Sequence, residues 1–166
     1  VGIGDMGSGL AKNLIKNGFS VIGLDLLEHR KLAFEAMGGQ LARDYAEIGR
    51  ASDAVFVMVM NGTEAKEIIL GENGLVASME KGGAILLTAT IKPTEAREIG
   101  AAMAGSGIDL IDSPVSGGFP GAQGGSLTLM AAAPADILAK NRRVMEAVSK
   151  TIHHVGSDAG MGQTVK

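Results

Sequence analysis

One uninterrupted apolar run, Ala54–Met60, constrains the fold more than any other feature of the sequence. It lies between Asp53 and Asn61 and is apolar at odd and even positions alike, so a strand built from it would have no face suited to water. Strands buried on both faces are typical of parallel sheets that helices cover on either side. A membrane-spanning helix needs about 20 apolar residues, so we expect no membrane span here.

The rest of the chain alternates short apolar runs with segments of helical periodicity, which is typical of strands joined by crossover helices. The predicted strands are Val1–Ile3, Ser20–Asp25, Gln40–Ala42, Ala54–Met60, Ala84–Thr90, Asp109–Ser113, Leu127–Ala132 and Ile152–Val155. The predicted helices are Met6–Asn17, Glu28–Met37, Tyr45–Ala51, Thr63–Leu70, Pro93–Ala104 and Pro134–Lys150. The segment Gly117–Gly125 holds five glycines and Pro120, so we expect a loop there rather than a helix.

The composition narrows the classes of protein to which the chain can belong. Its 166 residues suit one domain, and a net charge of −3 offers no basic face for nucleic acid. The absence of cysteine excludes a disulfide framework, a thiolate nucleophile and a cysteine zinc site. His153 and His154 have no further ligand candidates at suitable spacing, so no metal site is expected. We expect a cytoplasmic protein, with an organelle left open as its compartment.

The glycine motif Gly2-x-Gly4-x-x-Gly7 follows a predicted strand and opens a predicted helix. The first glycine permits the tight turn, the second lets a pyrophosphate approach the backbone, and the third lets the helix pack close to the strand. Asp5 and Met6 lie between them, where the helix N-terminus offers N–H groups to phosphates. We therefore predict an α/β fold of the Rossmann type, doubly wound, with a mostly parallel sheet and helices on both faces. A structural turn without a ligand, or an FAD or S-adenosylmethionine site, is the alternative interpretation.

Asp25 follows Gly7 by 18 residues at the end of the next predicted strand, where an acidic side chain can accept hydrogen bonds from a ribose. Its charge would repel a 2′-phosphate, so NAD is favoured over NADP. Arg30 keeps NADP open, and Asp25 acting only as a cap of the next helix is a further alternative. Asn61 and Thr90 lie at the C-terminal ends of other predicted strands, at the edge where ligands gather, so they are candidates for ribose or nicotinamide contacts or for simple caps.

Four motifs in order resemble the β-hydroxyacid dehydrogenases, a family that includes 3-hydroxyisobutyrate dehydrogenase and, more distantly, 6-phosphogluconate dehydrogenase. They are Gly2-Ile3-Gly4-Asp5-Met6-Gly7 with Ala11-Lys12-Asn13-Leu14, Asp112-Ser113-Pro114-Val115-Ser116-Gly117-Gly118, Ala122-x-x-Gly125-x-Leu127-Thr128 with Met130, and Gly160-Met161-Gly162-Gln163-Thr164-Val165-Lys166.

Within that family, three stretches resemble the L-threonate dehydrogenases: Gly71-Glu72-Asn73-Gly74, Gly23-Leu24-Asp25-Leu26 and Gly162-Gln163-Thr164-Val165-Lys166. Two departures bear on ligand contacts. Ala89 precedes Thr90 where the family often has serine, and Ala131-Ala132-Ala133 stands where many members have paired glycines. Neither change removes a group that the chemistry needs.

The resemblance implies an oxidoreductase that transfers a hydride between NAD(P) and a small hydroxy acid, such as the sugar acid L-threonate. It implies that Lys166 is the catalytic acid–base group, which accepts the hydroxyl proton in oxidation. It also implies that Ser116, Gly117 and Gly118 bind the substrate, which fits the ability of a hydroxyl and unobstructed N–H groups to hold a carboxylate.

The domain expectation is a single dinucleotide-binding domain over residues 1–166, trimmed at both ends. The resemblance implies that the start of the first strand and a helical C-terminal domain are absent, and that this second domain mediates dimerisation. Two other functions stay open. One is a reductase of small aldehydes, such as glyoxylate or semialdehydes, which would use the same site in reverse. The other is a non-catalytic NAD-binding or dimerisation module.

Overall fold

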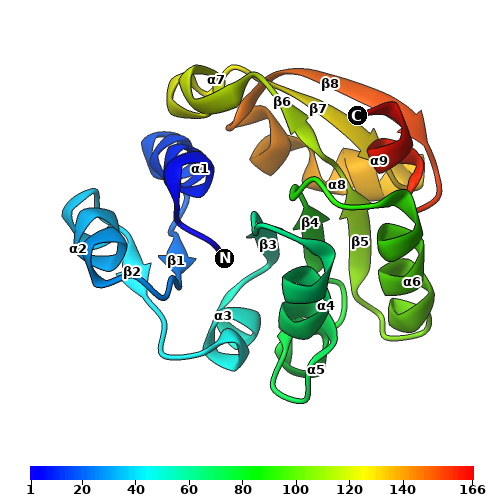
Figure 1. Ribbon diagram of the computed structural model, residues 1–166, viewed down its shortest axis with the longest axis horizontal. Helices are drawn as coiled ribbons and strands as arrows, with labels where there is room; N and C mark the ends of the chain where they lie inside the picture. Colours follow the sequence, from blue (N-terminus) through cyan, green and yellow to red (C-terminus); the bar gives the residue numbers. More distant parts are fainter.

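The computed structural model describes all 166 residues, which alternate between helices and strands (Figure 1). The helices are α1 (Asp5–Lys16), α2 (Glu28–Ala36), α3 (Tyr45–Ala51), α4 (Gly62–Leu70), α5 (Leu75–Ser78), α6 (Pro93–Met103), α7 (Gly118–Gly124), α8 (Ala135–Glu146) and α9 (Met161–Val165). The strands are β1 (Ile22–Gly23), β2 (Gln40–Leu41), β3 (Ala54–Val57), β4 (Ala84–Leu87), β5 (Asp109–Asp112), β6 (Val115–Ser116), β7 (Leu127–Ala132) and β8 (Ser149–Gly156). None of these helices has the length and apolar composition that a membrane span requires.

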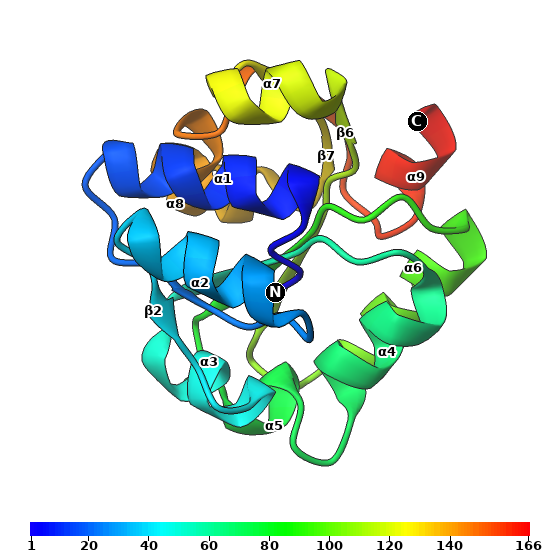
Figure 2. The same cartoon turned by 60° about the vertical axis from the view of Figure 1, so that its left-hand side comes forward.

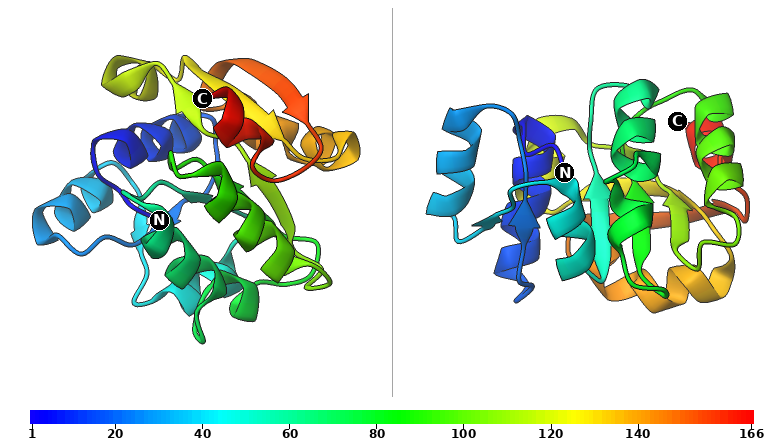
Figure 3. Two further views of the ribbon diagram at one scale, coloured as in Figure 1. Left: turned by 45° about the vertical axis from the view of Figure 1, so that its right-hand side comes forward. Right: turned by 90° about the horizontal axis from the view of Figure 1, so that it is seen from below.

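Parallel pairing predominates among the strands, as the sequence predicts. β3, β4 and β5 pair in parallel, with Val57, Leu87 and Asp112 side by side at their carboxyl ends. β7 runs antiparallel to β5 and β6 but parallel to β8, while β1 and β2 form a separate parallel pair. Figure 3 shows the central strands with helices in front of and behind them. The carboxyl ends of β3, β4 and β5 therefore meet at one edge of the sheet.

Alternate residues of the central strands contribute to two separate apolar cores. Val55 and Val57 of β3 pack in the core formed with α3, α4, α5 and α6, whereas Phe56 packs in the core formed with α1, α7 and α8. Burying one such side chain contributes about 1.5–3 kcal/mol. Both faces of β3 are thus covered by helices, which confirms the interpretation of its uninterrupted apolar run.

The predicted strand Val1–Ile3 is not a strand in the structure, although it occupies the place of one. The N–H of Gly2 donates to the carbonyl of Leu24 at 3.3 Å, and the N–H of Met58 donates to the carbonyl of Val1 at 3.0 Å. These bonds tie the segment to the chain after β1 on one side and after β3 on the other. The segment is too short to form a continuous hydrogen-bond ladder with either neighbour. The β1–β2 pair and the larger sheet therefore remain separate.

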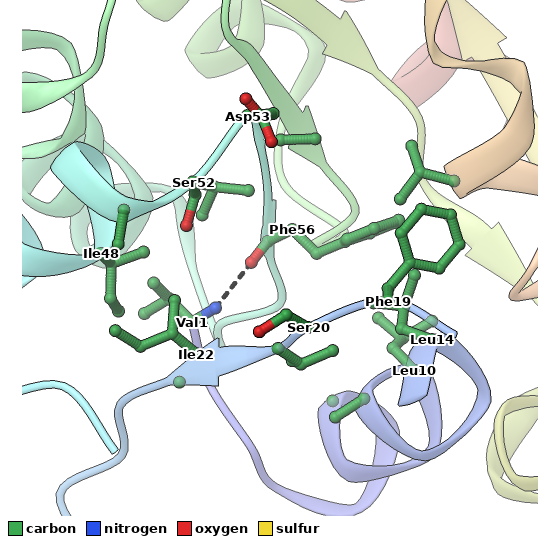
Figure 4. Close-up of a pocket in the computed structure, with 18 of the residues that line it drawn as sticks. Val1, Leu10, Leu14, Phe19, Ser20, Ile22, Ile48, Ser52, Asp53 and Phe56 are labelled. Carbon is green, nitrogen blue, oxygen red and sulfur yellow. Dashed lines mark hydrogen bonds between the residues drawn. The ribbon is translucent and has the colours of Figure 1, made fainter. Parts of the chain in front are cut away.

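A cavity of about 600 Å³ lies beside this segment, between β1 and β3 (Figure 4). Its lining is mostly apolar and includes Leu10, Phe19, Ile22 and Phe56, and the amino group of Val1 donates to the carbonyl of Phe56 at 2.7 Å. The lining includes Asp53 and Gly82, which precede β3 and β4, and it does not include Asp25, Asn61 or Thr90.

The predicted loop at Gly117–Gly125 is wrong, because α7 forms there. Pro120 lies in the first turn of α7, where no intrahelical N–H bond is lost. α7 packs on α1 (Figure 2). The side-chain amide of Asn13 donates to the carbonyl of Ala122 at 2.8 Å, and a Cβ on Gly9 would lie 2.6 Å from the Ala122 backbone. Small residues let the two helices approach closely, and this packing outweighs the poor helix propensity of glycine.

Several strands end earlier than the sequence predicts. The strand predicted at Ala54–Met60 ends at Val57, and the one predicted at Ala84–Thr90 ends at Leu87. The pairing of β3 with β4 ends at Val57 and Leu87. Met60, three residues later, is 86% exposed. β8 is longer than predicted, and α5, β6 and α9 are elements that the sequence did not predict.

Candidate functional site

The glycine loop leaves no room for side chains where the chain enters α1. Gly2 has a φ of +79°, and a Cβ there would lie 2.1 Å from the carbonyl oxygen of Met58. A Cβ on Gly7 would lie 1.8 Å from the carbonyl oxygen of Gly2. Gly4 is the N-cap of the 12-residue helix α1 and provides no side-chain cap. The N–H groups of the first turn are thus free to meet an anion, with the positive end of the helix dipole behind them.

Asp25 lies directly beside this loop and is only 8% exposed. Its Oδ2 accepts from the N–H of Ile3 at 3.0 Å, and its Oδ1 accepts from the N–H of Leu27 at 3.0 Å, at the entrance to α2. The Nη1 atom of Arg30 stands 3.5 Å from Oδ2, and the Arg30 guanidinium also lies against Gly4. The interpretation of Asp25 as the cap of the next helix is wrong, because the N-cap of α2 is Leu27 and no side chain caps it. Asp25 instead holds a carboxylate at the glycine loop and accepts from the turn before α2.

The other candidates for cofactor contacts lie at the same edge of the sheet. Asp5 is exposed in the first turn of α1, and Met6 is partly buried against the second core. Asn61 is the N-cap of α4, where its Oδ1 accepts from the N–H of Glu64 at 2.9 Å. The capping interpretation of Asn61 is thus observed directly. Thr90 is exposed three residues after the end of β4.

The candidate substrate residues lie where β6 leads into α7. Ser116 pairs with Thr128 across β6 and β7, and Gly117 and Gly118 adopt φ values of +128° and +58° at the start of α7. All three candidates are exposed. Because the Asn13 amide joins α7 to α1, this segment is attached to the helix that begins at the glycine loop.

Lys166, the candidate acid–base group, follows the last turn of α9 and is exposed. α9 itself packs on α6, β5, β7 and β8, and its Gln163 forms hydrogen bonds with the segment after β4. Its Gln163 is buried and donates from Nε2 to Oδ1 of the buried Asp112 at 2.9 Å. Burial raises the pKa of the Asp112 carboxyl above its usual range, and hydrogen bonds from Gln163 and neighbouring backbone N–H groups oppose that rise.

Sequence reasoning missed three polar residues that organise this edge: Asn13, Asp112 and Gln163. All three occur within motifs that resemble the dehydrogenase family, but the sequence gives no sign of their partners. Asp112 does carry a local signal, since it is a carboxylate at the end of an apolar strand. The other two form hydrogen bonds across 51 or more residues of sequence, which no local pattern reports.

Comparison with known proteins supports the same arrangement. Residues 1–156 match the family of the NAD binding domain of 6-phosphogluconate dehydrogenase. An L-threonate dehydrogenase from Escherichia coli O6:H1 is 34% identical over 167 residues, covering 100% of this chain and 55% of that enzyme. An NAD-dependent L-serine dehydrogenase from Pseudomonas aeruginosa is 36% identical over 166 residues, again covering 100% of this chain and 55% of that enzyme. The chain thus spans just over half the length of these relatives.

Solved structures agree with the sequence relatives. The crystal structure of a 3-hydroxyisobutyrate dehydrogenase from Salmonella typhimurium matches with a TM-score of 0.92 and 29% identity, over 99% of this chain and 57% of that chain. The Rossmann-type fold and the resemblance to hydroxyacid dehydrogenases, with L-threonate dehydrogenases among the relatives, are therefore confirmed. The chain belongs to the family of NAD-binding domains represented by 6-phosphogluconate dehydrogenase.

Proposed function

We propose that this chain is the cofactor-binding part of an NAD-dependent dehydrogenase that acts on small hydroxy acids. The observation that carries the proposal is the placement of three segments at the carboxyl-end edge of the sheet: the glycine loop before α1, the Ser116–Gly118 segment that follows β5, and α9, which is bonded to Asp112 at the end of β5. The relatives support the reaction class, since they include dehydrogenases named for L-threonate, L-serine and 3-hydroxyisobutyrate.

The residues of the glycine loop fit a dinucleotide. The N–H groups of the first turn of α1 would bind the pyrophosphate, and Gly4, which has no side chain, would let the pyrophosphate approach the backbone. The Asp25 carboxylate would accept hydrogen bonds from the adenosine ribose, while Asn61 and Thr90 stand at the strand ends nearer the reacting half of the cofactor. Bound NAD would supply the acceptor for the hydride.

The remaining chemistry is proton transfer and orientation. The Ser116 hydroxyl and the exposed backbone N–H groups at Gly117 and Gly118 would bind the carboxylate of the substrate. The Lys166 amine would accept the hydroxyl proton as the hydride leaves carbon, and would donate that proton in the reverse reaction. A lysine requires an environment that disfavours its charged form to act as a base near neutral pH, and a cationic nicotinamide ring beside it has that effect.

The substrate that we propose is a sugar acid such as L-threonate. Reduction of small aldehydes by the same residues, and cofactor binding without catalysis, are the outcomes against which the proposal is tested. A panel of L-threonate, L-serine, 3-hydroxyisobutyrate and glyoxylate should be assayed with the intact protein, with formation or consumption of NADH followed by absorbance.

We expect oxidation of a hydroxy acid, and we expect Lys166→Met to lower kcat by about 10²–10⁴-fold while NAD still binds. Lys150→Met, which changes an exposed lysine of β8, is the matched control and should leave kcat unchanged. NAD binding without turnover of any member of the panel would instead indicate a binding module. Turnover that survives Lys166→Met would remove Lys166 from the mechanism.

A further inference from the structure

A buried carboxylate caps α9. Asp112, at the end of β5, has no exposed surface. Its Oδ2 accepts from the N–H of Gly160 at 2.7 Å and from the N–H of Gln163 at 3.3 Å, so it caps the helix from outside its own sequence. Its Oδ1 accepts from Nε2 of Gln163 at 2.9 Å. Both oxygens are therefore committed to α9 and the residue before it.

The side-chain amide of Gln163 extends this contact to the end of β4. Gln163 is 6% exposed, and its Nε2 donates a second bond to the carbonyl of Ala89 at 3.0 Å. Its Oε1 accepts from the N–H of Ile91 at 3.0 Å. Both donors of the amide and its acceptor oxygen are thus used, and the two backbone partners flank Thr90. Only a side chain that donates twice and accepts once can satisfy all three neighbours.

Close backbone packing also fixes the position of α9. A Cβ on Gly162 would lie 2.6 Å from the carbonyl oxygens of both Asp112 and Met130. Gly160 has a φ of +91° and lies against the carbonyl of Pro93. A helix of five residues is not stable by itself, so its position depends on these contacts.

No charged group pairs with Asp112. The elements packed on α9 are α6, β5, β7 and β8, and their titratable or charged residues are Glu95, Arg97, Glu98, Asp109, Lys150, His153 and His154. Arg97 lies against Gly160, but the hydrogen bonds of Asp112 come from Gln163 and backbone N–H groups. The carboxylate is therefore stabilised by neutral donors, of which Gln163 is the only side chain.

Three functional segments meet at this pair of side chains. β4 leads to Thr90, β5 leads to Ser116, and α9 leads to Lys166. We propose that Asp112 and Gln163 are positioning residues, a clamp that fixes the Lys166 helix against the strand ends carrying the cofactor and substrate segments. The clamp does not touch the reacting atoms. Its catalytic consequence rests on the proposed function, because it matters to turnover only if Lys166 transfers the proton.

Gln163→Glu tests this proposal, because in this variant pH should determine whether the contact between residues 112 and 163 forms. When the introduced carboxyl group is protonated, it can still donate to Asp112 and accept from the N–H of Ile91, and it loses only the bond to the carbonyl of Ala89, which is lost equally at every pH. When both carboxyl groups lose their protons, two buried like charges repel each other, so the pair should hold one proton to a higher pH than an ordinary carboxyl. In this variant only, the two side chains should therefore hold α9 in place at low pH and release it at high pH.

Two measurements on the intact protein test whether Asp112 and Gln163 position α9. The first is the ratio of kcat for Gln163→Glu to wild-type kcat across pH, and we expect it to fall by about 10–100-fold as pH rises, since a displacement of about 1 Å can cost that much. The second is hydrogen exchange of the Gly160–Lys166 amides, which should accelerate over the same pH range. Gln40→Glu, which makes the same change at an exposed residue of β2, is the matched control and should show neither effect.

The outcomes separate the clamp from the proposed function. A flat kcat ratio with unchanged amide exchange would overturn the clamp, and so would a loss of kcat that is equal at every pH, because that is what a merely less stable protein shows. If the wild-type protein turns over none of the hydroxy acids, the proposed function fails. The exchange measurement still tests the clamp in that case, because it does not depend on turnover.

Discussion

Gly7 is the residue at which the backbone is least tolerant of a side chain. We predict that Gly7→Ala lowers the free energy of unfolding by about 3 kcal/mol or more, since its Cβ would lie 1.8 Å from the carbonyl oxygen of Gly2 and the backbone must move. Gly124→Ala is the control, because its Cβ would meet only Ser126 at 3.5 Å. Urea denaturation of both variants measures the difference, and equal stabilities would contradict the close packing of the loop.

Asp25 and Arg30 together decide which cofactor the loop prefers. We predict that Asp25→Asn lowers the preference for NAD over NADP by roughly 10-fold or more, since a hydrogen bond to a charged group contributes about 1.5–3 kcal/mol. Calorimetric titration with each cofactor measures the ratio. Arg30→Ala is the companion variant: if it abolishes NADP binding while Asp25→Asn changes nothing, the arginine governs the ribose site and our interpretation of Asp25 is wrong.

At the residue scale, the sequence predicts those groups whose roles are local. Asp44 directly precedes α3 and is of a residue type that caps helices, and it accepts from the N–H of Glu47 at 2.7 Å. Asn61 is recognised as a candidate because it directly follows a strand. Gln163 is different, because all its partners lie far away in sequence, and only the folded chain brings them within hydrogen-bond distance.

At the scale of elements, the buried side-chain amide of Asn13 joins α1 to α7. The Nδ2 atom of Asn13 donates to carbonyls of Gly9, Ala122 and Gln123 at 2.9, 2.8 and 3.2 Å. We predict that Asn13→Ala costs about 1–3 kcal/mol of stability, because a buried carbonyl of α7 loses its donor. Asn17→Ala, one turn later and exposed, should cost less than about 1 kcal/mol. Thermal unfolding compares the two, and a larger loss at Asn17 would refute the assignment.

α7 also explains where prediction of elements fails. Propensity and turn composition argue for a loop at Gly117–Gly125, because they take no account of what the segment packs against. The contact with α1 reverses the outcome, since the small residues that weaken a helix also let it approach Gly9. The strongly periodic helices and the apolar central strands, by contrast, lie within a few residues of their predicted positions, because burial and local periodicity favour the same structure there.

The cavity between β1 and β3 predicts that an added strand would stabilise the sheet. An extended segment joined to Val1 would run between both strands and contact Leu10, Phe19 and Phe56. We predict that four β-branched apolar residues added before Val1 raise the midpoint of thermal unfolding by at least about 4 °C, since each buried side chain contributes about 1.5–3 kcal/mol. Four added glycines are the control. An equal midpoint for both would show that the cavity does not accept a strand.

At the scale of the whole molecule, we expect residues 1–166 to bind the cofactor but to turn over substrate poorly. The glycine loop, Asp25 and the strand ends lie within residues 1–166, so we predict that this chain alone binds NAD. Ser116, Gly117, Gly118 and Lys166 are all exposed to water, whereas hydride and proton transfer require a site that excludes water and holds the reactants in place. We therefore expect kcat for residues 1–166 to be at least about 100-fold below that of the intact protein on the same hydroxy acid. Calorimetry with NAD and a turnover assay, run on both proteins, test the two halves of this prediction. Turnover within about tenfold of the intact protein would mean that the exposed edge is already a complete catalytic site.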